Sequence, residues 1–176
     1  AQGANRHVIT TENLTIACSN GYLQLVMYLM EEIGLIPHNN APLRYAVFEG
    51  HHEIVRYLVQ KTKVDIREND SYLLRYAAKV GNLQMLETLV DLGADAHAKE
   101  GEAFRSAVKE GHLDCVKCLV ERGGVDDEII VDMVSGGGLS GAIKWYLGDV
   151  FEKILAQMCT QSAAPQKRIV KAPRPI

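Results

Sequence analysis

The sequence has no long apolar segment and only a few cysteines. Of its 176 residues, 47% are hydrophobic, but no run approaches the roughly 20 apolar residues of a membrane span, and no signal peptide is visible. The four cysteines, Cys18, Cys115, Cys118 and Cys159, follow no disulfide spacing, which fits a reducing compartment. We therefore expect a cytoplasmic protein with no membrane partner.

Recognisable catalytic constellations are also missing. His52 and Glu53 could form a base with its carboxylate partner, but no nucleophile is placed with them. The glycines at 136–138 are not followed by the Lys-Ser or Lys-Thr pair of a phosphate-binding loop. The motifs thus predict no enzyme and no cofactor.

Charge of one sign gathers only at the C-terminal end. The stretch from Ser162 to Ile176 has four basic residues and no acid, and subtracting this +4 from the net charge of −3 leaves −7 for the rest. An acidic folded part lacks the basic face of nucleic-acid-binding proteins, so we expect no nucleic-acid partner. Residues 161–176, with three prolines, are expected to be extended or disordered. This tail could be a peptide ligand, a tether to an acidic surface, a weak nuclear signal, a linker or a solvated end.

One ten-residue segment occurs four times along the chain. It reads GYLQLVMYLM, GHHEIVRYLV, GNLQMLETLV and GHLDCVKCLV, and its first glycines are 29, 31 and 30 residues apart. An alanine precedes each glycine by four residues. A fixed period of this size indicates a stacked repeat architecture, in which each unit contacts only its neighbours. The glycines are Gly21, Gly50, Gly81 and Gly111, and the alanines are Ala17, Ala46, Ala77 and Ala107.

Each unit contains two short amphipathic helices joined at the repeated glycine. Around Gly50, apolar residues three or four positions apart lie on one face of each predicted helix. The glycine itself occupies a turn that needs a positive φ. The segments between consecutive pairs are rich in Asp, Asn, Gly and Lys, which is typical of a short projecting turn. The predicted fold class is an all-α solenoid of about five stacked helix-turn-helix units.

The CxxC pair Cys115 and Cys118 lies inside the fourth unit. Cys115 takes the place that Leu25, Ile54 and Met85 have in other units, where the second helix is expected to face the core. No second CxxC exists, and His112 alone does not complete a tetrahedral zinc site. We interpret Cys115 as a core residue and predict no metal.

These residues resemble the ankyrin repeat, whose pattern contains T-P-L-H-x-A-A-x-x-G-H and, later, G-A-D. PLRYA from Pro42 stands in the T-P-L-H-x-A place, GH at Gly50 and at Gly111 in the G-H place, and GAD from Gly93 in the last. The stretches IRENDSYLLRYAAKVGN and VKEGHLDCVKCLVERGG further resemble the ankyrin variant of large DNA viruses of amoebae, such as mimivirus. The resemblance implies a non-enzymatic repeat domain.

The register divides the chain into an ankyrin repeat domain at 1–160 and the tail. The first unit is expected to cap one end of the array, and Trp145 to cover the other. The resemblance is good over the first four repeats and weak over the fifth. The repeats are predicted near 7–36, 37–66, 67–97 and 98–126, with a degenerate capping repeat at 127–158.

Arginine replaces the family histidine at one position of three units. Repeated at one place in a stack, these arginines could form a basic stripe for an acidic ligand, or an internal ladder that links helix to turn. Residues five positions earlier could cap the helix start. The arginines are Arg44, Arg75 and Arg105, and the earlier residues are Asn39, Asp70 and Glu100.

The family resemblance implies binding of a protein partner, in a scaffold or adaptor role, through two surfaces. One is formed by the exposed part of the first helices on the concave side, and the other by the tips of the turns. Exposed aromatic residues near such a groove are typical binding anchors, so Phe48 is either an anchor or packs against the neighbouring turn. The candidates on the concave side are Phe48, Glu49, Lys79, Val80, Lys109 and Glu110, and those at the tips are Asn39, Asn40, Arg67, Asn69, Tyr72, Lys99 and Glu102.

Other functions stay open. The chain could be an accessory or self-associating region of a larger protein, although a monomer is the first expectation. The viral resemblance adds a host-directed or effector adaptor that acts in the host cytosol.

Overall fold

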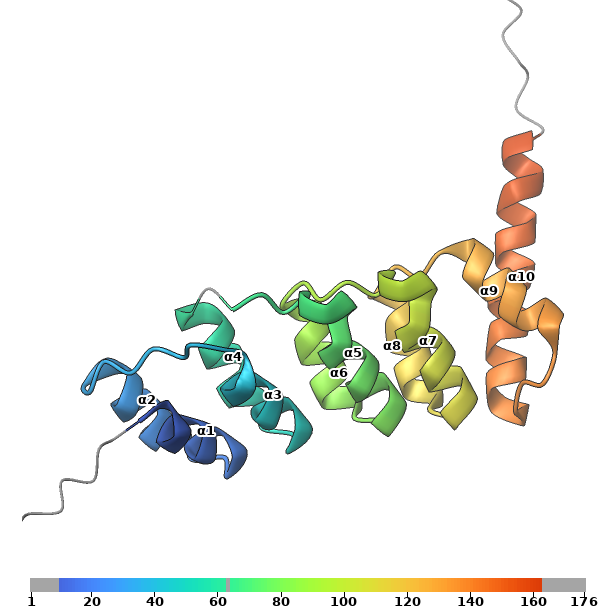
Figure 1. The fold of residues 1–176 in the computed structure, drawn as a ribbon. Helices are drawn as coiled ribbons and strands as arrows, with labels where there is room; N and C mark the ends of the chain where they lie inside the picture. Colours follow the sequence, from blue (N-terminus) through green and yellow to red (C-terminus); the bar gives the residue numbers. More distant parts are fainter. Residues whose placement is uncertain (1–9, 63, 163–176) are drawn as a thin grey trace, which may run out of the picture.

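The computed structural model describes residues 10–62 and 64–162, and within these ranges it contains ten helices and no strand (Figure 1). The predicted all-α class is confirmed. The helices are α1 (Thr11–Ser19), α2 (Leu23–Glu31), α3 (Ala41–Phe48), α4 (His52–Lys61), α5 (Glu68–Val80), α6 (Leu83–Asp91), α7 (Ala98–Glu110), α8 (Leu113–Glu121), α9 (Asp127–Gly136) and α10 (Gly141–Ser162).

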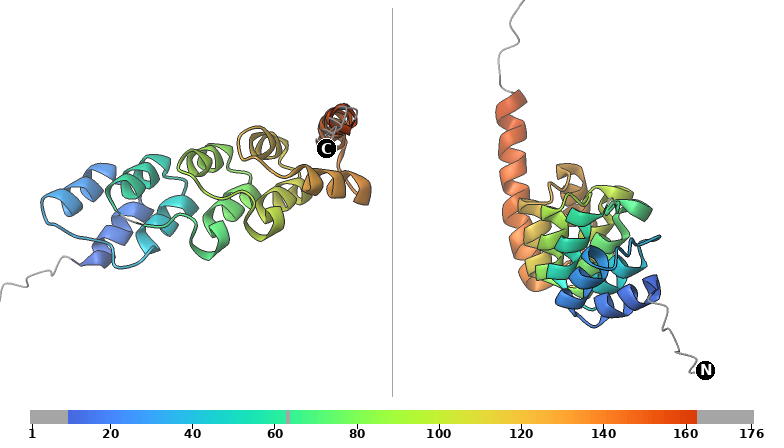
Figure 2. Two further views of the ribbon diagram at one scale, coloured as in Figure 1. Left: turned by 90° about the horizontal axis from the view of Figure 1, so that it is seen from above. Right: turned by 90° about the vertical axis from the view of Figure 1, so that its left-hand side faces the viewer.

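The helices form five antiparallel pairs that stack side by side into an elongated array (Figures 1 and 2). The first helices of the pairs, α1, α3, α5, α7 and α9, make one layer, and the second helices, from α2 to α10, make the other. Each first helix packs on its own second helix and on neighbouring first helices, and each second helix also contacts the second helices beside it. A continuous core runs between the layers, so each pair depends on its neighbours for burial, as a solenoid requires.

The repeated alanine and glycine have the roles that their spacing predicts. The four alanines, exemplified by Ala46 and Ala77, are buried where one first helix packs against the next. The glycine of each of the first four units has a positive φ, between 76° and 84°. This backbone conformation is open to glycine and turns the chain from the first helix into the second.

Two histidines of the G-H motif connect adjacent repeats. His51 Nε2 donates to the carbonyl oxygen of Ser19 in the preceding repeat at 3.0 Å, and His112 Nε2 donates to that of Lys79 at 3.1 Å. The His112 ring fills the space beside Gly81, where an added Cβ would lie 2.5 Å from the ring. These histidines are therefore structural, as the sequence indicates.

Polar contacts also join successive second helices along the outer layer. Lys61 and the Tyr57 hydroxyl contact the Glu31 carboxylate at 2.9 and 3.1 Å, and their hydrogen bonds hold the pKa of Glu31 below its ordinary value. All these groups are largely exposed, so each pair adds little stability. The further links are Arg56–Asp91, Arg122–Glu87, Arg122–Asp91 and Tyr146–Glu121.

The last pair departs from the sequence-based expectation in one respect. Ile143, Leu147 and Ile154 of α10 are buried, so the second helix of this pair contributes to the core. Trp145, however, is 79% exposed, so the prediction that it covers the end of the array is wrong. None of the described residues covers most of its surface.

The C-terminal boundary of the helical array lies slightly beyond the predicted one. Helix α10 ends at Ser162, so the first two residues assigned to the tail are helical. The rest of the tail prediction falls on residues 163–176, outside the described residues.

Candidate partner-binding surface

Four aromatic rings meet on the layer of first helices. The Phe48 ring from α3 lies 4.5 Å from the Tyr76 ring of α5, measured between centroids, and 6.2 Å from the Tyr72 ring. Tyr45 joins from α3, with its ring edge-on to Phe48 at 6.5 Å. We call Tyr45, Phe48, Tyr72 and Tyr76 the aromatic patch. Edge-on and tilted contacts of this kind favour a fixed arrangement of rings.

Helical spacing places these rings on one face. Tyr45 and Phe48 stand five and two residues before Gly50, and Tyr72 and Tyr76 stand nine and five residues before Gly81. Positions three or four residues apart share a helix face, so the patch continues from one repeat to the next. A hollow of about 600 Å³ between α1 and α3 extends the apolar surface and includes Ile16 in its wall.

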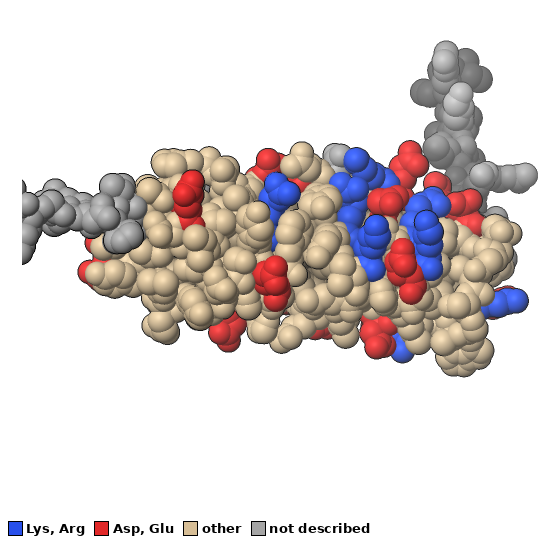
Figure 3. All heavy atoms as spheres, turned by 60° about the horizontal axis from the view of Figure 1, so that its bottom comes forward, with Lys and Arg blue, Asp and Glu red and all other residues tan. Residues whose placement is uncertain are grey.

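Charge is distributed unequally over this layer. Figure 3 shows few charged side chains over the N-terminal half of the array and many over the C-terminal half. Two cations lie against the patch: the Arg44 guanidinium carbon is 5.8 Å from the Phe48 ring centroid, and that of Arg75 is 5.6 Å from Tyr72. Such contacts keep the aromatic faces partly covered and orient the arginines.

The arginine ladder is internal at two of its three positions. Arg75 Nη2 donates to the carbonyl of Asn69 at 3.1 Å, and Arg105 Nε donates to that of Glu100 at 3.2 Å. Both carbonyls belong to left-handed turns with positive φ that precede the regular part of the helix. Arg105 also pairs with Asp132 of the next unit at 3.1 Å. These contacts favour the link from helix to turn over a stripe for acidic ligands.

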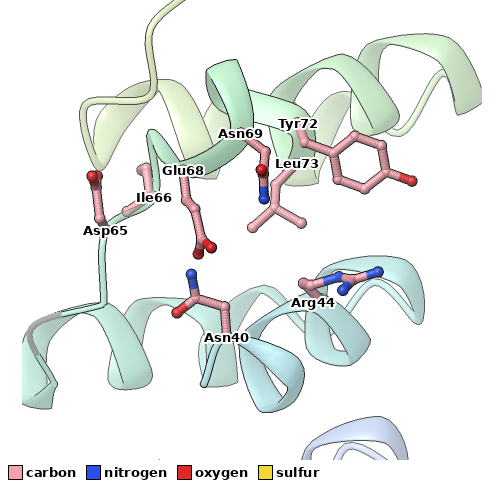
Figure 4. Close-up of a pocket in the computed structure, with 8 residues that line it drawn as sticks. All are labelled: Asn40, Arg44, Asp65, Ile66, Glu68, Asn69, Tyr72 and Leu73. Carbon is pink, nitrogen blue, oxygen red and sulfur yellow. The ribbon is translucent and has the colours of Figure 1, made fainter. Parts of the chain in front are cut away.

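The turn tips enclose a hollow of about 240 Å³ between α3 and the start of α5 (Figure 4). Figure 4 shows the side chains of Asn40 and Glu68 pointing toward one another across it, with Arg44 and Tyr72 at one end. Its walls therefore combine polar groups with the edge of the aromatic patch. The lining residues are Asn40, Arg44, Asp65, Ile66, Glu68, Asn69, Tyr72 and Leu73.

Some of the predicted binding residues lie together in the structure, and others form hydrogen bonds within the turns. Phe48 and Tyr72, predicted on different surfaces, lie together in the aromatic patch. Asn39 accepts a hydrogen bond from the Ala41 amide at 2.9 Å, and Arg67 Nε donates to the Gly93 carbonyl at 3.0 Å, so both hold the turns in place. Asn40 is half-buried, and the exposed predicted residues are Asn39, Glu49, Arg67, Asn69, Tyr72, Lys79, Val80, Lys99, Glu102, Lys109 and Glu110.

The expectation that both Phe48 and Val80 are exposed is only half right. Val80 is 55% exposed on α5, but Phe48 is half-buried because the Tyr76 ring packs against it. Tyr45 and Tyr76 were not among the predicted residues. The sequence does contain a pattern that could have identified them, because a large apolar or aromatic residue stands five positions before the repeat glycine in three units. These residues are Ile16, Tyr45 and Tyr76.

Three of the four cysteines, Cys18, Cys115 and Cys118, lie in the core. Cys115 and Cys118 are buried, and burial raises the pKa of the Cys115 thiol to about 11. Burial likewise raises the pKa of Cys18 to about 12. Over the described parts of the chain, no group of three His, Cys, Asp or Glu side chains could hold a metal ion.

Thiol reactivity measures this burial directly. In a Cys159→Ser chain, Cys18 and Cys115 should react with a disulfide reagent at pH 8 at least about 100-fold more slowly in buffer than in urea, because only the thiolate reacts and burial raises the pKa of both thiols. Burial also raises the pKa of Cys118, so its reaction should be slowed too. Fast reaction of Cys115 and Cys118 in the folded chain would show that the CxxC is accessible and contradict the core assignment.

Comparison with known families agrees with the fold. Two ankyrin family models match, one described as ankyrin repeats (3 copies) over residues 3–70 and one as ankyrin repeats (many copies) over residues 74–120. Together they span more than half of the chain. The chain belongs to the ankyrin-repeat family, whose repeats are protein–protein interaction modules and not catalytic domains.

Curated relatives share the repeats within much longer proteins. The chain is 29% identical over 113 residues to the ankyrin repeat and KH domain-containing protein mask-1 of Caenorhabditis elegans, covering 62% of this chain and 4% of that protein. It is 28% identical over 121 residues to the probable E3 ubiquitin-protein ligase XBOS32 of Oryza sativa subsp. japonica, covering 62% of this chain and 24% of that protein. The chain thus spans less than a quarter of either relative's length. Among the described residues, no helix combines the length and the apolar character needed to cross a membrane.

Proposed function

We propose that this chain is a non-enzymatic scaffold or adaptor module that binds a partner protein through the aromatic patch and the adjoining turn tips. The observation that carries the proposal is the gathering of Tyr45, Phe48, Tyr72 and Tyr76, with two arginines, on one face of a rigid array. Tyr and Arg are the residues over-represented among binding hot spots. Tyr45 and Tyr72 remain exposed although the repeat needs no tyrosine at either position to fold.

The neighbouring side chains define what the partner presents. Apolar or aromatic groups would contact the patch, and polar groups would reach Lys79, Glu102, Lys109 and Glu110 on the more charged C-terminal side. Such a partner would bury the rings at the centre of the interface and leave the charges at its rim. The acidic folded part gives no reason to propose a nucleic acid.

Affinity capture with a matched control tests this proposal. A Tyr45→Ala, Tyr72→Ala chain should bind a partner captured from eukaryotic lysate about 5- to 150-fold more weakly than the unchanged chain, which corresponds to about 1–3 kcal/mol. The control is Trp145→Ala, which removes an exposed aromatic ring at the far end of the array. Equal retention by the double variant, or loss with Trp145→Ala alone, would refute the role of the patch.

A narrower role follows from the sequence pattern. The resemblance to ankyrin proteins of amoebal DNA viruses supports the proposal of a host-directed adaptor that acts in the host cytosol as a monomer. An accessory region of a larger protein is the alternative, and the small share of each relative that the chain spans is compatible with it.

A further inference from the structure

A second apolar surface lies at the N-terminal end of the array, on α2. Tyr22, Leu25 and Tyr28 follow one another at intervals of three residues, so they share one side of the helix. Their exposed fractions are 59%, 44% and 53%. We call these three residues the leading face. Terminal repeats that face water need a polar outer face, and the part of this end that the structure describes is apolar at these three positions.

The equivalent side of the second helix is buried in each of the next three repeats. The place of Leu25, four residues after the glycine, is taken by Ile54, Met85 and Cys115, and each of these is 1% exposed. The preceding repeat supplies the cover: α4 packs on α2, α6 on α4 and α8 on α6. The leading face is therefore equivalent to this interface, and no described helix covers it as a preceding repeat would.

Tyr28 indicates which polar group a repeat packed against the leading face would present. It stands seven residues after its glycine, as Tyr57 does, and the Tyr57 hydroxyl donates to the Glu31 carboxylate of the preceding repeat at 3.1 Å. In the last pair, the Tyr146 hydroxyl donates in the same way to Glu121 of the preceding repeat at 3.3 Å. Both acids stand ten residues after their repeat glycine. A carboxylate at that place is the partner that the Tyr28 hydroxyl fits.

The C-terminal end of another copy of this chain does not fit the leading face. The contact between Tyr146 and Glu121 aligns α10 with the other second helices and places Lys144 where Val26 and Val55 are fully buried. Lys144 is exposed, and stacking a repeat on this end would bury its ammonium group without a partner. The two ends therefore differ, because the last pair is capped by charge and the first is apolar.

We propose that the leading face is a stacking interface for one further ankyrin-type repeat, supplied in line ahead of α1. Its second helix would place apolar side chains against Leu25 and a carboxylate against the Tyr28 hydroxyl. The argument uses the burial of equivalent residues within the same array and is independent of the aromatic patch. With such a unit the array would continue, and the contact between α2 and α4 would be repeated one unit earlier.

A tandem duplication tests the proposal with this chain's own residues. A second copy of residues 10–38 is inserted immediately before Thr10, which places a copy of Glu31 opposite the original Tyr28. Because neighbouring repeats fold together, the folding equilibrium constant should rise about tenfold or more, in a single urea transition. Reaction of the original Tyr28 with hydroxyl radicals should fall severalfold. An added unit that unfolds separately, with the midpoint of the rest unchanged, would overturn the proposal.

Matched variants identify the surface that causes the added stability of the duplicated chain. Leu25→Lys in the original copy should abolish the rise in the folding equilibrium constant. Val80→Asp changes an exposed residue of α5 outside the leading face, so it should preserve that rise. Replacing Tyr28 by Phe and the added Glu31 by Gln should cost less together than the sum of the single changes, since both remove one hydrogen bond. Additive costs would contradict the assigned carboxylate contact.

Two measurements on the unduplicated chain test whether a second copy, or another segment of the same chain, covers the leading face. Concentration-dependent dimers in sedimentation velocity that vanish with Leu25→Lys would show that a second copy covers the leading face. A loss of stability with Leu25→Lys as large as for a core substitution would show that another segment of this chain covers it. Either result would overturn the proposal, whereas a monomer of unchanged stability supports it.

Discussion

Phe104→Ala should lower the free energy of unfolding by about 3–5 kcal/mol, the largest effect of a single substitution that we expect in this array. Phe104 is fully buried in α7, between the layers of the fourth repeat. Removing its ring leaves a cavity that short helices on both sides cannot close without losing their own contacts. Urea unfolding followed by circular dichroism measures the change.

The matched control for Phe104 is Ile16→Ala, which removes an exposed apolar side chain from α1. It should change the unfolding free energy by about 0.5 kcal/mol or less. Because the repeats share one core, the Phe104→Ala chain should also unfold in one transition at a lower midpoint. A separate early transition of the fourth repeat, with the others unaffected, would show that the repeats are not coupled.

Gly81→Ala should cost about 2–5 kcal/mol, from two causes that add at this position. An alanine must adopt the left-handed conformation with φ near 78°, which costs about 1–2 kcal/mol. Its Cβ must also displace the His112 ring, which would lie 2.5 Å away, and overpacking of this kind costs about 1–3 kcal/mol. The hydrogen bond between His112 and the Lys79 carbonyl would be lost with the ring position.

Gly111→Ala separates the two causes. Gly111 has nearly the same φ, 84°, but no atom lies within 4 Å of its added Cβ, so only the conformational cost of about 1–2 kcal/mol should remain. Thermal unfolding of the two variants side by side gives the difference. Equal destabilisation would mean that the His112 ring does not hold adjacent repeats together.

The repeat register was readable from the sequence because local patterns determine it. Alanine, glycine and the apolar stripes recur at fixed distances, and each acts within its own helix pair or on the next one. The positive φ of Gly50 and the core position of Cys115 follow from this register, and the structure confirms both. The structural role of His112 follows from the same alignment.

The features that the sequence analysis missed depend on neighbours about 30 residues away. Phe48 is half-buried because Tyr76 of the next repeat packs on it, and neither residue's own helix reveals that contact. The left-handed turn at Lys99 and Glu100, by contrast, is local, and Arg105 donates to the Glu100 carbonyl five residues earlier. Trp145 was expected to cover an end of the array, but its side chain on α10 is 79% exposed.

Hydroxyl-radical footprinting of the chain with its captured partner tests the central claim most directly. Tyr45 and Tyr72 on the aromatic patch should react in the free chain and be protected in the complex. Tyr22 and Tyr28 are internal controls of the same residue type and similar exposure, and they should react equally in both states. Protection of Tyr22 and Tyr28, with Tyr45 and Tyr72 unchanged, would place the partner on the N-terminal end of the array and contradict the account.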